Sequence, residues 1–421
     1  MNVIGRCTFL AACLFAPLVL AEPMLNDGDR MVFCGDSITD QMQYTRMVMD
    51  YFALRHPGRK LVFFNAGISG STAGGWKAGI DQHVLSRKPT VVSVCLGMND
   101  GQYRAFNEKL AADYVANITA IVKTIKAAGV RVVLLTPGII DDDRISPARG
   151  RGVYNDTLAR YARSVEDVAA REQVPVFNIH ALMLDVQRRA KAQDPTFTMI
   201  PDGVHPAAPG HALMAYGLLK VLGAVTPASA ATINAPRGTA TAQRCTVTDL
   251  QVTDDRIAFT RTDDALPTYL HPEAVQAIGK YTTIFDELSD YRLTVNGLKA
   301  GEWKLVVDQK PVGSYSADDL AKGVNLAAAP GPWQQLAQAV DDRAGEASRQ
   351  YYIVFHGLGA RHFPQAPDAL TPELRRLSTE IETARVVFVE KLVQLYETSE
   401  HARADIPAAH RTWRWTLSLA P

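Results

Sequence analysis

The sequence predicts an α/β fold in which a parallel sheet is covered by helices on both faces. From about residue 30 to residue 223, short apolar runs alternate strictly with longer segments whose apolar residues recur at helical spacing. The chain has 421 residues, of which 47% are hydrophobic. It is therefore long enough to bury a substantial core and to carry a second, smaller region after the α/β part.

The elements of the α/β part can be assigned in order from these patterns. We expect strands at Met31–Cys34, Lys60–Asn65, Thr90–Leu96, Arg131–Thr136 and Val174–Asn178. We expect helices near Gln41–Arg55, Ala73–Val84, Asn107–Ala128, Tyr154–Arg171, Ala181–Ala192 and Gly210–Leu222. Gly129 follows the third of these helices and is a suitable C-cap before the next β-branched run.

A boundary is predicted at residues 224–243, which are rich in Ala, Thr and Pro and read as a linker. Beyond it we expect a smaller α+β region over residues 244–421, β-rich at first and helical afterwards. The expected strands are Thr246–Thr253, Arg256–Thr262, Tyr291–Val295, Glu302–Val307 and Val312–Tyr315, the third and fourth lying on either side of a hairpin-like turn. The expected helices are one starting at Ser316, Trp333–Val354 and a long one from Thr371 to about Tyr396.

The first residues, 1–21, read as a cleaved signal peptide. Arg6 precedes a short apolar run, and Val19-Leu20-Ala21 has small residues at the spacing of a signal-peptidase site. We therefore expect a mature chain that begins at Glu22 and is exported to the periplasm or beyond the cell. The apolar run is shorter than the roughly 20 residues that a membrane span requires, so no span is expected.

Charge and cysteine content limit the partners and the cofactors. The 44 basic and 44 acidic residues give a formal net charge of zero, so we expect no general attraction to nucleic acid or to an anionic membrane. Removal of the signal peptide leaves Cys34, Cys95 and Cys245. We interpret Cys34 and Cys95 as buried thiols, with a single bridge between them as the alternative. No spacing typical of metal ligands is present, and no cofactor is expected.

Ser37 is the first candidate functional residue. The apolar run ending at Cys34 stops at Gly35, delivers Asp36 and Ser37, and passes into a segment with helical spacing. A strand that ends in this way directs the serine out of the carboxyl edge of a parallel sheet, at a helix N-terminus where unpaired N–H groups favour negative charge. This placement suits a nucleophile. The simpler interpretation is that Asp36 and Ser37 only cap the helix.

Three further stretches follow predicted strands or close the α/β part. Residues 65–72 form a glycine-rich turn around Gly70, and residues 96–100 present the side-chain amide of Asn99. Near the end comes Asp202-Gly203-Val204-His205-Pro206, in which an acid three residues before a histidine can orient the imidazole as a base. Each stretch alone also suits an ordinary loop or turn.

Together these four stretches resemble the four sequence blocks of the SGNH (GDSL-type) hydrolases, in the family order and over residues 30–223. The resemblance implies a flavodoxin-like three-layer α/β/α sandwich. It implies Ser37 as nucleophile, His205 as general base and Asp202 as its orienting acid. It also implies an oxyanion hole formed by the backbone N–H groups of Ser37 and Gly70 and by the side chain of Asn99. Met98 replaces a glycine found in many members.

The function that this resemblance implies is ester hydrolysis through an acyl-enzyme, on a small-molecule or polysaccharide ester. We expect removal of short acyl groups, such as acetyl, from a carbohydrate. A lipid or aryl esterase and a non-catalytic polysaccharide-binding protein on an esterase core are the alternatives. The role of residues 244–421 stays open, with a polysaccharide-contacting module and a stability or docking domain as the two candidates.

Several other residues have less specific interpretations. Trp76 is a candidate for the wall of a substrate pocket, with helix packing as the alternative. Residues 141–143, three consecutive aspartates, are interpreted as a solvated loop and not as a metal site. His356 and His362 are expected to pack locally or to lie on a surface loop, and Trp413 and Trp415 are expected to pack.

Overall fold

The computed structural model describes residues 25–352, 376, 391, 394–398, 406–407 and 411–420. The predicted signal peptide, His356, His362 and most of the helix predicted from Thr371 to about Tyr396 lie outside the described residues. In the part of the chain that the structure describes, no helix is both long enough and apolar enough to cross a membrane.

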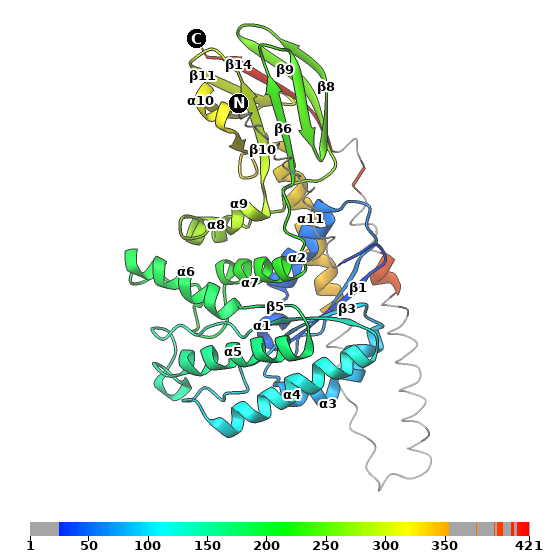
Figure 1. The fold of residues 1–421 in the computed structure, drawn as a ribbon, viewed down its shortest axis with the longest axis vertical. Coiled ribbons are helices and arrows are strands. Elements are labelled where there is room, and N and C mark those ends of the chain that lie inside the picture. The colour runs from blue at the N-terminus through cyan, green and yellow to red at the C-terminus, as the bar shows by residue number, and fades with distance from the viewer. Residues whose placement is uncertain are drawn as a thin grey trace, which may run out of the picture.

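The first sheet has the parallel arrangement that the sequence predicts (Figure 1). Its strands are β1 (Arg30–Gly35), β2 (Val62–Asn65), β3 (Val91–Cys95), β4 (Arg131–Leu135) and β5 (Val176–Phe177). They are hydrogen-bonded in the order β2-β1-β3-β4-β5, and each neighbouring pair is parallel. This is the flavodoxin-like order, in which ligands bind outside the carboxyl ends of the strands.

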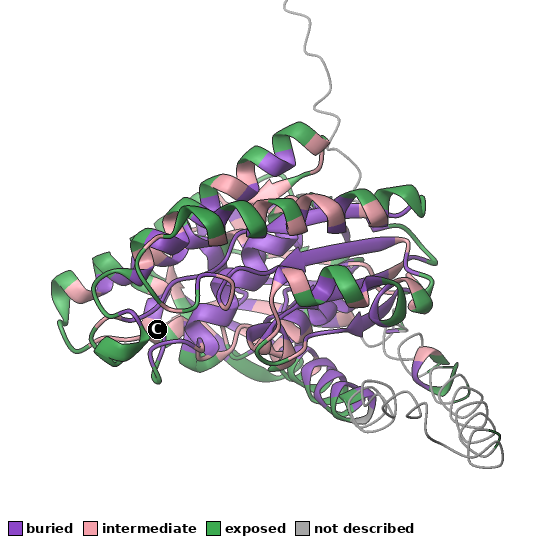
Figure 2. Cartoon of the chain, turned by 90° about the horizontal axis from the view of Figure 1, so that it is seen from below, coloured by how far each residue is buried: buried purple, intermediate pink, exposed green. Residues whose placement is uncertain are grey.

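Helices cover both faces of this sheet, which confirms the three-layer sandwich (Figure 2). Successive residues of β1 point to opposite faces: Met31 and Phe33 join one core cluster, and Val32 and Cys34 join the other. The helices are α1 (Ser37–Asp40), α2 (Gln43–Arg55), α3 (Ala73–His83), α4 (Glu108–Ala127), α5 (Tyr154–Glu172), α6 (Ile179–Gln193) and α7 (Ala208–Val221). Burial on both faces explains why these strands read as continuous apolar runs.

The C-terminal region contains two further sheets around one core. The first has the order β13-β10-β6-β7 and consists of β6 (Ser229–Asn234), β7 (Thr239–Gln243), β10 (Tyr291–Asn296) and β13 (Val324–Asn325). The second has the order β12-β11-β14-β9-β8 and consists of β8 (Cys245–Val252), β9 (Arg256–Asp263), β11 (Glu302–Val307), β12 (Lys310–Ser316) and β14 (Thr412–Leu419). The helices of the C-terminal region are α8 (Pro272–Ile278), α9 (Ile284–Leu288), α10 (Ala317–Lys322) and α11 (Pro332–Tyr352).

Three predictions for this region are wrong in detail. Residues 224–243 are not simply a linker, because they contain β6 and β7, in which small Ala and Thr side chains suffice for strand pairing. β10 and β11 do not pair with each other: β10 lies parallel to β6, whereas β11 lies between β12 and β14. Finally, the chain returns after the helical part as strand β14, between β9 and β11.

The predictions for the tryptophans and cysteines in the described residues are confirmed. Trp413 and Trp415 are 6% and 0% exposed, and both lie in the core of the C-terminal region. Cys34 and Cys95 are free and buried, so the alternative of a bridge between them is wrong.

The C-terminal region is attached to the α/β part mainly through helix α2. Leu54 belongs to the core cluster of the C-terminal sheets, and its carbonyl accepts a hydrogen bond from the Leu266 N–H at 2.9 Å. Arg46 of α2 forms an ion pair with Asp341 of α11 at 3.0 Å. Since α2 follows α1 after two residues, the C-terminal region supports the element that carries Ser37.

Candidate active site

Ser37 is the first residue of helix α1, directly beyond the carboxyl end of β1. Gly35 permits the close approach of this helix, since a Cβ on it would lie 1.9 Å from the hydroxyl oxygen of Thr39. The Asp36 side chain caps α1 by accepting a hydrogen bond from the Ile38 N–H at 3.0 Å. The capping role is therefore real, but it belongs to Asp36 and leaves the Ser37 side chain available.

The structure brings His205 and Asp202 into hydrogen-bonded series with Ser37. His205 Nε2 lies 2.9 Å from Ser37 Oγ, and His205 Nδ1 lies 2.7 Å from Asp202 Oδ2. The other oxygen of Asp202 accepts hydrogen bonds from the backbone N–H groups of Val204 and His205, at 2.9 and 2.7 Å. The Asp202 carboxylate is thus fixed by its own loop, and it in turn orients the imidazole.

The pKa of Asp202 lies below its usual range. Partial burial raises this pKa, but the hydrogen bonds from the His205 ring and from the backbone N–H groups of His205 and Val204 lower it by more. The carboxylate is therefore ionised at neutral pH, which favours the tautomer of His205 that donates from Nδ1 and accepts at Nε2.

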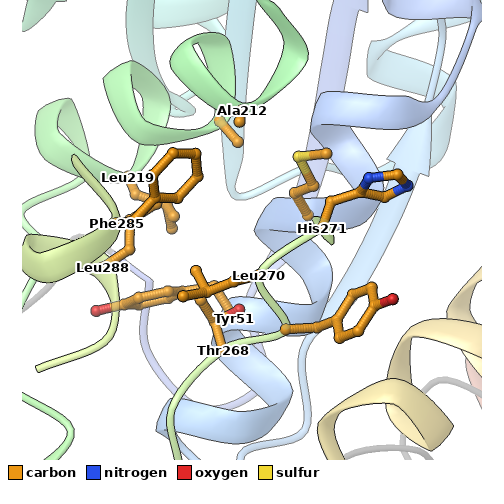
Figure 3. Close-up of a pocket in the computed structure, with 11 residues that line it drawn as sticks. Tyr51, Ala212, Leu219, Thr268, Leu270, His271, Phe285 and Leu288 are labelled. Carbon is orange, nitrogen blue, oxygen red and sulfur yellow. The ribbon is translucent and has the colours of Figure 1, made fainter. Parts of the chain in front are cut away.

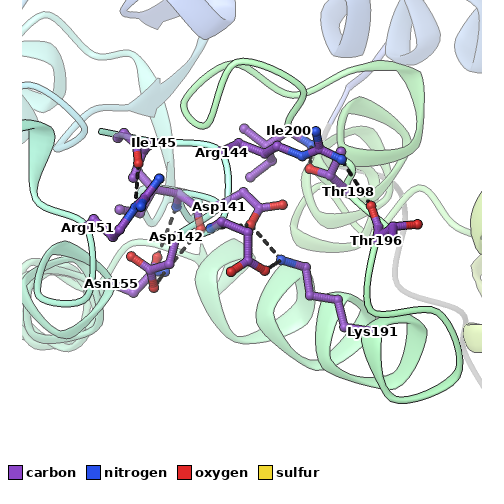
Figure 4. A network of polar contacts seen from close by, with 12 residues as sticks. Asp141, Asp142, Arg144, Ile145, Arg151, Asn155, Lys191, Thr196, Thr198 and Ile200 are labelled. Carbon is purple, nitrogen blue, oxygen red and sulfur yellow. Dashed lines mark hydrogen bonds and ion pairs between the residues drawn. The ribbon is translucent and has the colours of Figure 1, made fainter. Parts of the chain in front are cut away.

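A polar network corrects the interpretation of residues 141–143 as a solvated loop at Asp141, although Asp143 is exposed as expected (Figure 4). Asp141 is not solvated: it is 0% exposed, and Lys191 Nζ lies 2.6 Å from both Asp141 and Asp143. The Asp141 N–H donates to the carbonyl of Gly203, between Asp202 and His205, at 3.0 Å. An ammonium group thus holds these carboxylates. Among the described residues, no cluster of three potential metal ligands is found here or elsewhere.

The glycine-rich turn at residues 65–72 lies beside helix α1. Gly70 has a φ of +74°, in the left-handed region that favours glycine, although the space around it is open. The hydroxyl of the preceding Ser69 donates to the Asp40 carboxylate at 2.6 Å. This contact ties the turn to the helix that begins with Ser37, so the backbone of Gly70 is held on the same edge of the sheet.

Asn99 follows β3 and faces the same turn. Its side-chain nitrogen donates to the carbonyl of Ser71 at 2.9 Å, and its side-chain oxygen accepts from the hydroxyl of Tyr103 at 3.1 Å. A carboxamide nitrogen carries two hydrogens, so the bond to Ser71 leaves the second one for a ligand.

Sequence reasoning missed two residues that hold these loops together. Buried Asn65 donates to the carbonyl of Thr39 at 2.7 Å and accepts from the Gly67 N–H at 2.9 Å, which joins α1 to the glycine-rich turn. Asp100 accepts from the N–H of Ala73 at 2.9 Å, which joins the Asn99 loop to the start of α3. Asn65 ends β2, and Asp100 lies in the loop that follows β3, but these positions do not identify the partners of either side chain.

Trp76 does not line an open pocket. Its side chain is 2% exposed, and its indole N–H donates to the carbonyl of Gly35 and to the hydroxyl of Ser71, both at 2.9 Å. The alternative interpretation, packing of helix α3, is the one that the structure supports. Trp76 also holds the glycine-rich turn against the end of β1.

Two carboxyl groups lie near Ser37, of which Asp36 is buried and Asp100 is half-buried. Burial raises the pKa of Asp36 to about 7, and the nearby Asp100 adds to this rise, against the lowering effect of the hydrogen bond from Ile38. Burial likewise raises the pKa of Asp100 to about 6. In an unfolded chain an aspartate has a pKa of about 3.9, so the folded protein binds a proton at Asp36 more tightly than the unfolded chain does.

This difference predicts a pH-dependent effect of Asp36→Asn on stability. Below about pH 4 Asp36 is protonated in both states, and above about pH 7 the folded protein bears the full cost of a buried carboxylate. The stability of the wild type should therefore fall relative to Asp36→Asn as the pH rises through this window, because asparagine does not ionise. Asparagine also keeps the oxygen that caps α1, so the comparison isolates the charge. Thermal midpoints from pH 4 to 8, with exposed Asp81→Asn as control, test this; a constant difference would contradict it.

An apolar pocket lies elsewhere, between helices α2 and α7 and the segment that precedes α8 (Figure 3). Met47 and Tyr51 line it from α2, Leu219 lines it from α7, and Phe285 lines it from α9. The described residues of its lining include neither Ser37 nor His205, so this pocket is separate from the triad.

The fold and the site together define an ester-hydrolysing enzyme. Residues 33–213 match the model of the GDSL-like Lipase/Acylhydrolase family, in agreement with the SGNH-type resemblance of the four sequence blocks.

Two relatives extend the comparison. The chain is 27% identical over 225 residues to an acetylxylan esterase from Geobacillus stearothermophilus. The aligned region covers 47% of this chain and 96% of that protein. The solved structure of a gut microbial diltiazem-metabolizing enzyme is 25% identical, with a TM-score of 0.77, and the match covers 94% of this chain and 98% of that one. The second likeness includes the C-terminal sheets as well as the α/β part.

Proposed function

We propose that this protein is a serine esterase that removes short acyl groups, above all acetyl groups, from carbohydrates. The observation that carries the proposal is the hydrogen-bonded series of Ser37 Oγ, His205 Nε2, His205 Nδ1 and Asp202 Oδ2, with separations of 2.9 and 2.7 Å. A serine hydroxyl is a weak nucleophile at neutral pH, and an adjacent base in this geometry is what activates it.

In the proposed acylation step, His205 Nε2 takes the proton of the Ser37 hydroxyl as Oγ attacks the ester carbonyl carbon. The carbonyl oxygen becomes an oxyanion, which accepts hydrogen bonds from the backbone N–H groups of Ser37 and Gly70 and from the side chain of Asn99. When the intermediate collapses, His205 gives its proton to the departing alcohol oxygen. Asp202 stabilises the imidazolium in between and is not itself protonated.

Deacylation repeats these steps with water. His205 takes a proton from the water as its oxygen attacks the acyl carbon, and it then returns a proton to Ser37 Oγ as the carboxylic acid leaves. The products are an alcohol and a carboxylic acid, and the enzyme is regenerated.

The substrate class rests on the relatives. Similarity to an acetylxylan esterase over nearly the whole length of that protein supports an acetylated sugar as substrate. Similarity to a diltiazem-metabolizing enzyme over nearly the whole of this chain supports a second candidate, a small non-carbohydrate ester. In both cases Ser37 would carry the acyl group.

The test is a series of p-nitrophenyl esters from acetate to palmitate, followed by acetylated xylo-oligosaccharides. We expect acetate to have the highest kcat/KM and the acetylated sugars to release acetate. High activity on p-nitrophenyl acetate without activity on the acetylated sugars would favour the small-ester candidate. A maximum at long acyl chains would contradict the proposal and favour a lipid esterase.

A further inference from the structure

The oxygen of the Asn99 side chain has a hydrogen-bond partner that the proposed mechanism does not use. The hydroxyl of Tyr103 donates to Asn99 Oδ1 at 3.1 Å, while Asn99 Nδ2 donates to the carbonyl of Ser71 at 2.9 Å. The carboxamide is thus held from both ends. If it were rotated by 180°, its oxygen would face the Ser71 carbonyl and its nitrogen would face the Tyr103 hydroxyl, so both contacts fix the direction of the free N–H.

Tyr103 is itself held in an unusual backbone conformation. Gln102 and Tyr103 have φ values of +53° and +54°, in the left-handed region that residues other than glycine rarely adopt. Such conformations persist where surrounding contacts enforce them, and they occur most often at functional sites. Here the backbone of Gly150 approaches Tyr103 closely, since a Cβ on Gly150 would lie 2.7 Å from the Tyr103 carbonyl oxygen.

Aromatic packing fixes the ring of Tyr103. The ring of Tyr154 lies 5.0 Å from it, and the Tyr154 hydroxyl donates to the carbonyl of Met98 at 2.6 Å, next to Asn99. Partial burial raises the pKa of Tyr103, so its hydroxyl is protonated and able to donate at neutral pH.

A cation completes this arrangement. The guanidinium carbon of Arg149 lies 4.8 Å from the centre of the Tyr103 ring, within the range of a cation–π interaction. A positive charge on the ring face makes the phenol hydroxyl a stronger donor. The cation of Arg149 thus polarises the phenol of Tyr103, and the phenol hydroxyl in turn polarises the carboxamide of Asn99. Both effects increase the partial positive charge on the free N–H of Asn99.

We propose that Tyr103 is a positioning residue for the oxyanion hole, and that together with Arg149 it orients and polarises the side chain of Asn99. This inference rests on the proposed function, in which Asn99 donates to the oxyanion. The polarised N–H of Asn99 interacts more strongly with the full negative charge of the tetrahedral intermediate than with the ester carbonyl. Its effect therefore falls on kcat and much less on KM.

The test compares Tyr103→Phe with the wild type on p-nitrophenyl acetate. Removing an oxyanion donor outright lowers kcat by about 10²–10³-fold, so we expect the loss of its support to lower kcat by roughly 10- to 50-fold, with KM within about twofold. Arg149 is exposed, so Arg149→Met should fold normally, and it should lower kcat by roughly two- to fivefold for the same reason.

Two variants serve as matched controls. Tyr281→Phe removes a tyrosine hydroxyl that bonds Gln193 at 3.4 Å, away from the triad. Arg160→Met removes an arginine whose guanidinium lies 4.4 Å from the ring of Phe106. Both should keep the kcat of the wild type. A purely structural role for Tyr103 would lower the thermal midpoint without separating kcat from KM.

The outcomes distinguish the inference from the proposed function. A Ser37→Ala variant that stays active defeats the proposed function and the inference with it. An inactive Ser37→Ala beside a fully active Tyr103→Phe overturns the inference alone, as does a loss that appears only in KM. If Tyr103→Phe does not fold, the test rests on Arg149→Met: a lowered kcat at unchanged KM supports the inference, and an unchanged kcat overturns it.

Discussion

Replacement of Ser37 by alanine is expected to lower kcat/KM for an acetyl ester by at least about 10³-fold. Ser37 Oγ is the atom that would form the covalent bond to the acyl group, and His205 Nε2 lies 2.9 Å away to accept its proton. Without the hydroxyl, only water can attack, and the remaining acceleration comes from binding and from the oxyanion donors. Initial rates on p-nitrophenyl acetate measure the effect.

The control for this variant is Ser164→Ala on the exposed face of helix α5, where the hydroxyl donates to the carbonyl of Arg160. It should retain wild-type activity. Both variants should keep the thermal midpoint within a few degrees, since Ser37 is only half-buried. An active Ser37→Ala enzyme would remove the serine mechanism and leave a binding protein on an esterase core as the better account.

Replacement of Asn99 by alanine is expected to lower kcat by about 10²–10³-fold, with a much smaller change in KM. The side-chain N–H of Asn99 would act on the oxyanion, which exists only after attack, so its removal raises the barrier and leaves substrate binding nearly intact. Asn99→Asp should lose more, because a carboxylate would place negative charge beside the oxyanion.

The Asn99→Ala variant also tests the role of Asn99 independently of the nucleophile Ser37. Stopped-flow measurement of acyl-enzyme formation should show slow acylation in Asn99→Ala, with Ser37 still the residue acylated. Wild-type kcat in Asn99→Ala would exclude Asn99 from the oxyanion hole, whatever the result for Ser37.

Much of the α/β part could be predicted because its strands are buried on both faces. Met31 and Val32 pack into opposite cores, and so the run appears apolar throughout. Ser37, Asn99 and Asp202 could be singled out because they follow strands or stand at a fixed spacing from a histidine. That information is local, and a single chain displays it directly.

The features that could not be predicted depend on partners far apart in sequence. Asp141 reads as solvated in a run of three aspartates, and Lys191 from helix α6 is what makes its burial tolerable. Tyr103 reads as a loop residue until the structure shows its hydroxyl on Asn99. Strand β14 does alternate Trp413, Trp415 and Leu417 inward, but nothing local predicts that it lies between β9 and β11.

Labelling with a fluorophosphonate, followed by peptide mapping, is the most direct test of whether Ser37 is the nucleophile. The reagent forms a stable tetrahedral adduct with an activated serine, in the geometry proposed for the oxyanion intermediate. We expect one stoichiometric label on the peptide that contains Ser37, loss of esterase activity in step with labelling, and no label in Ser37→Ala. A label on another serine, or full esterase activity in protein labelled at Ser37, would contradict it.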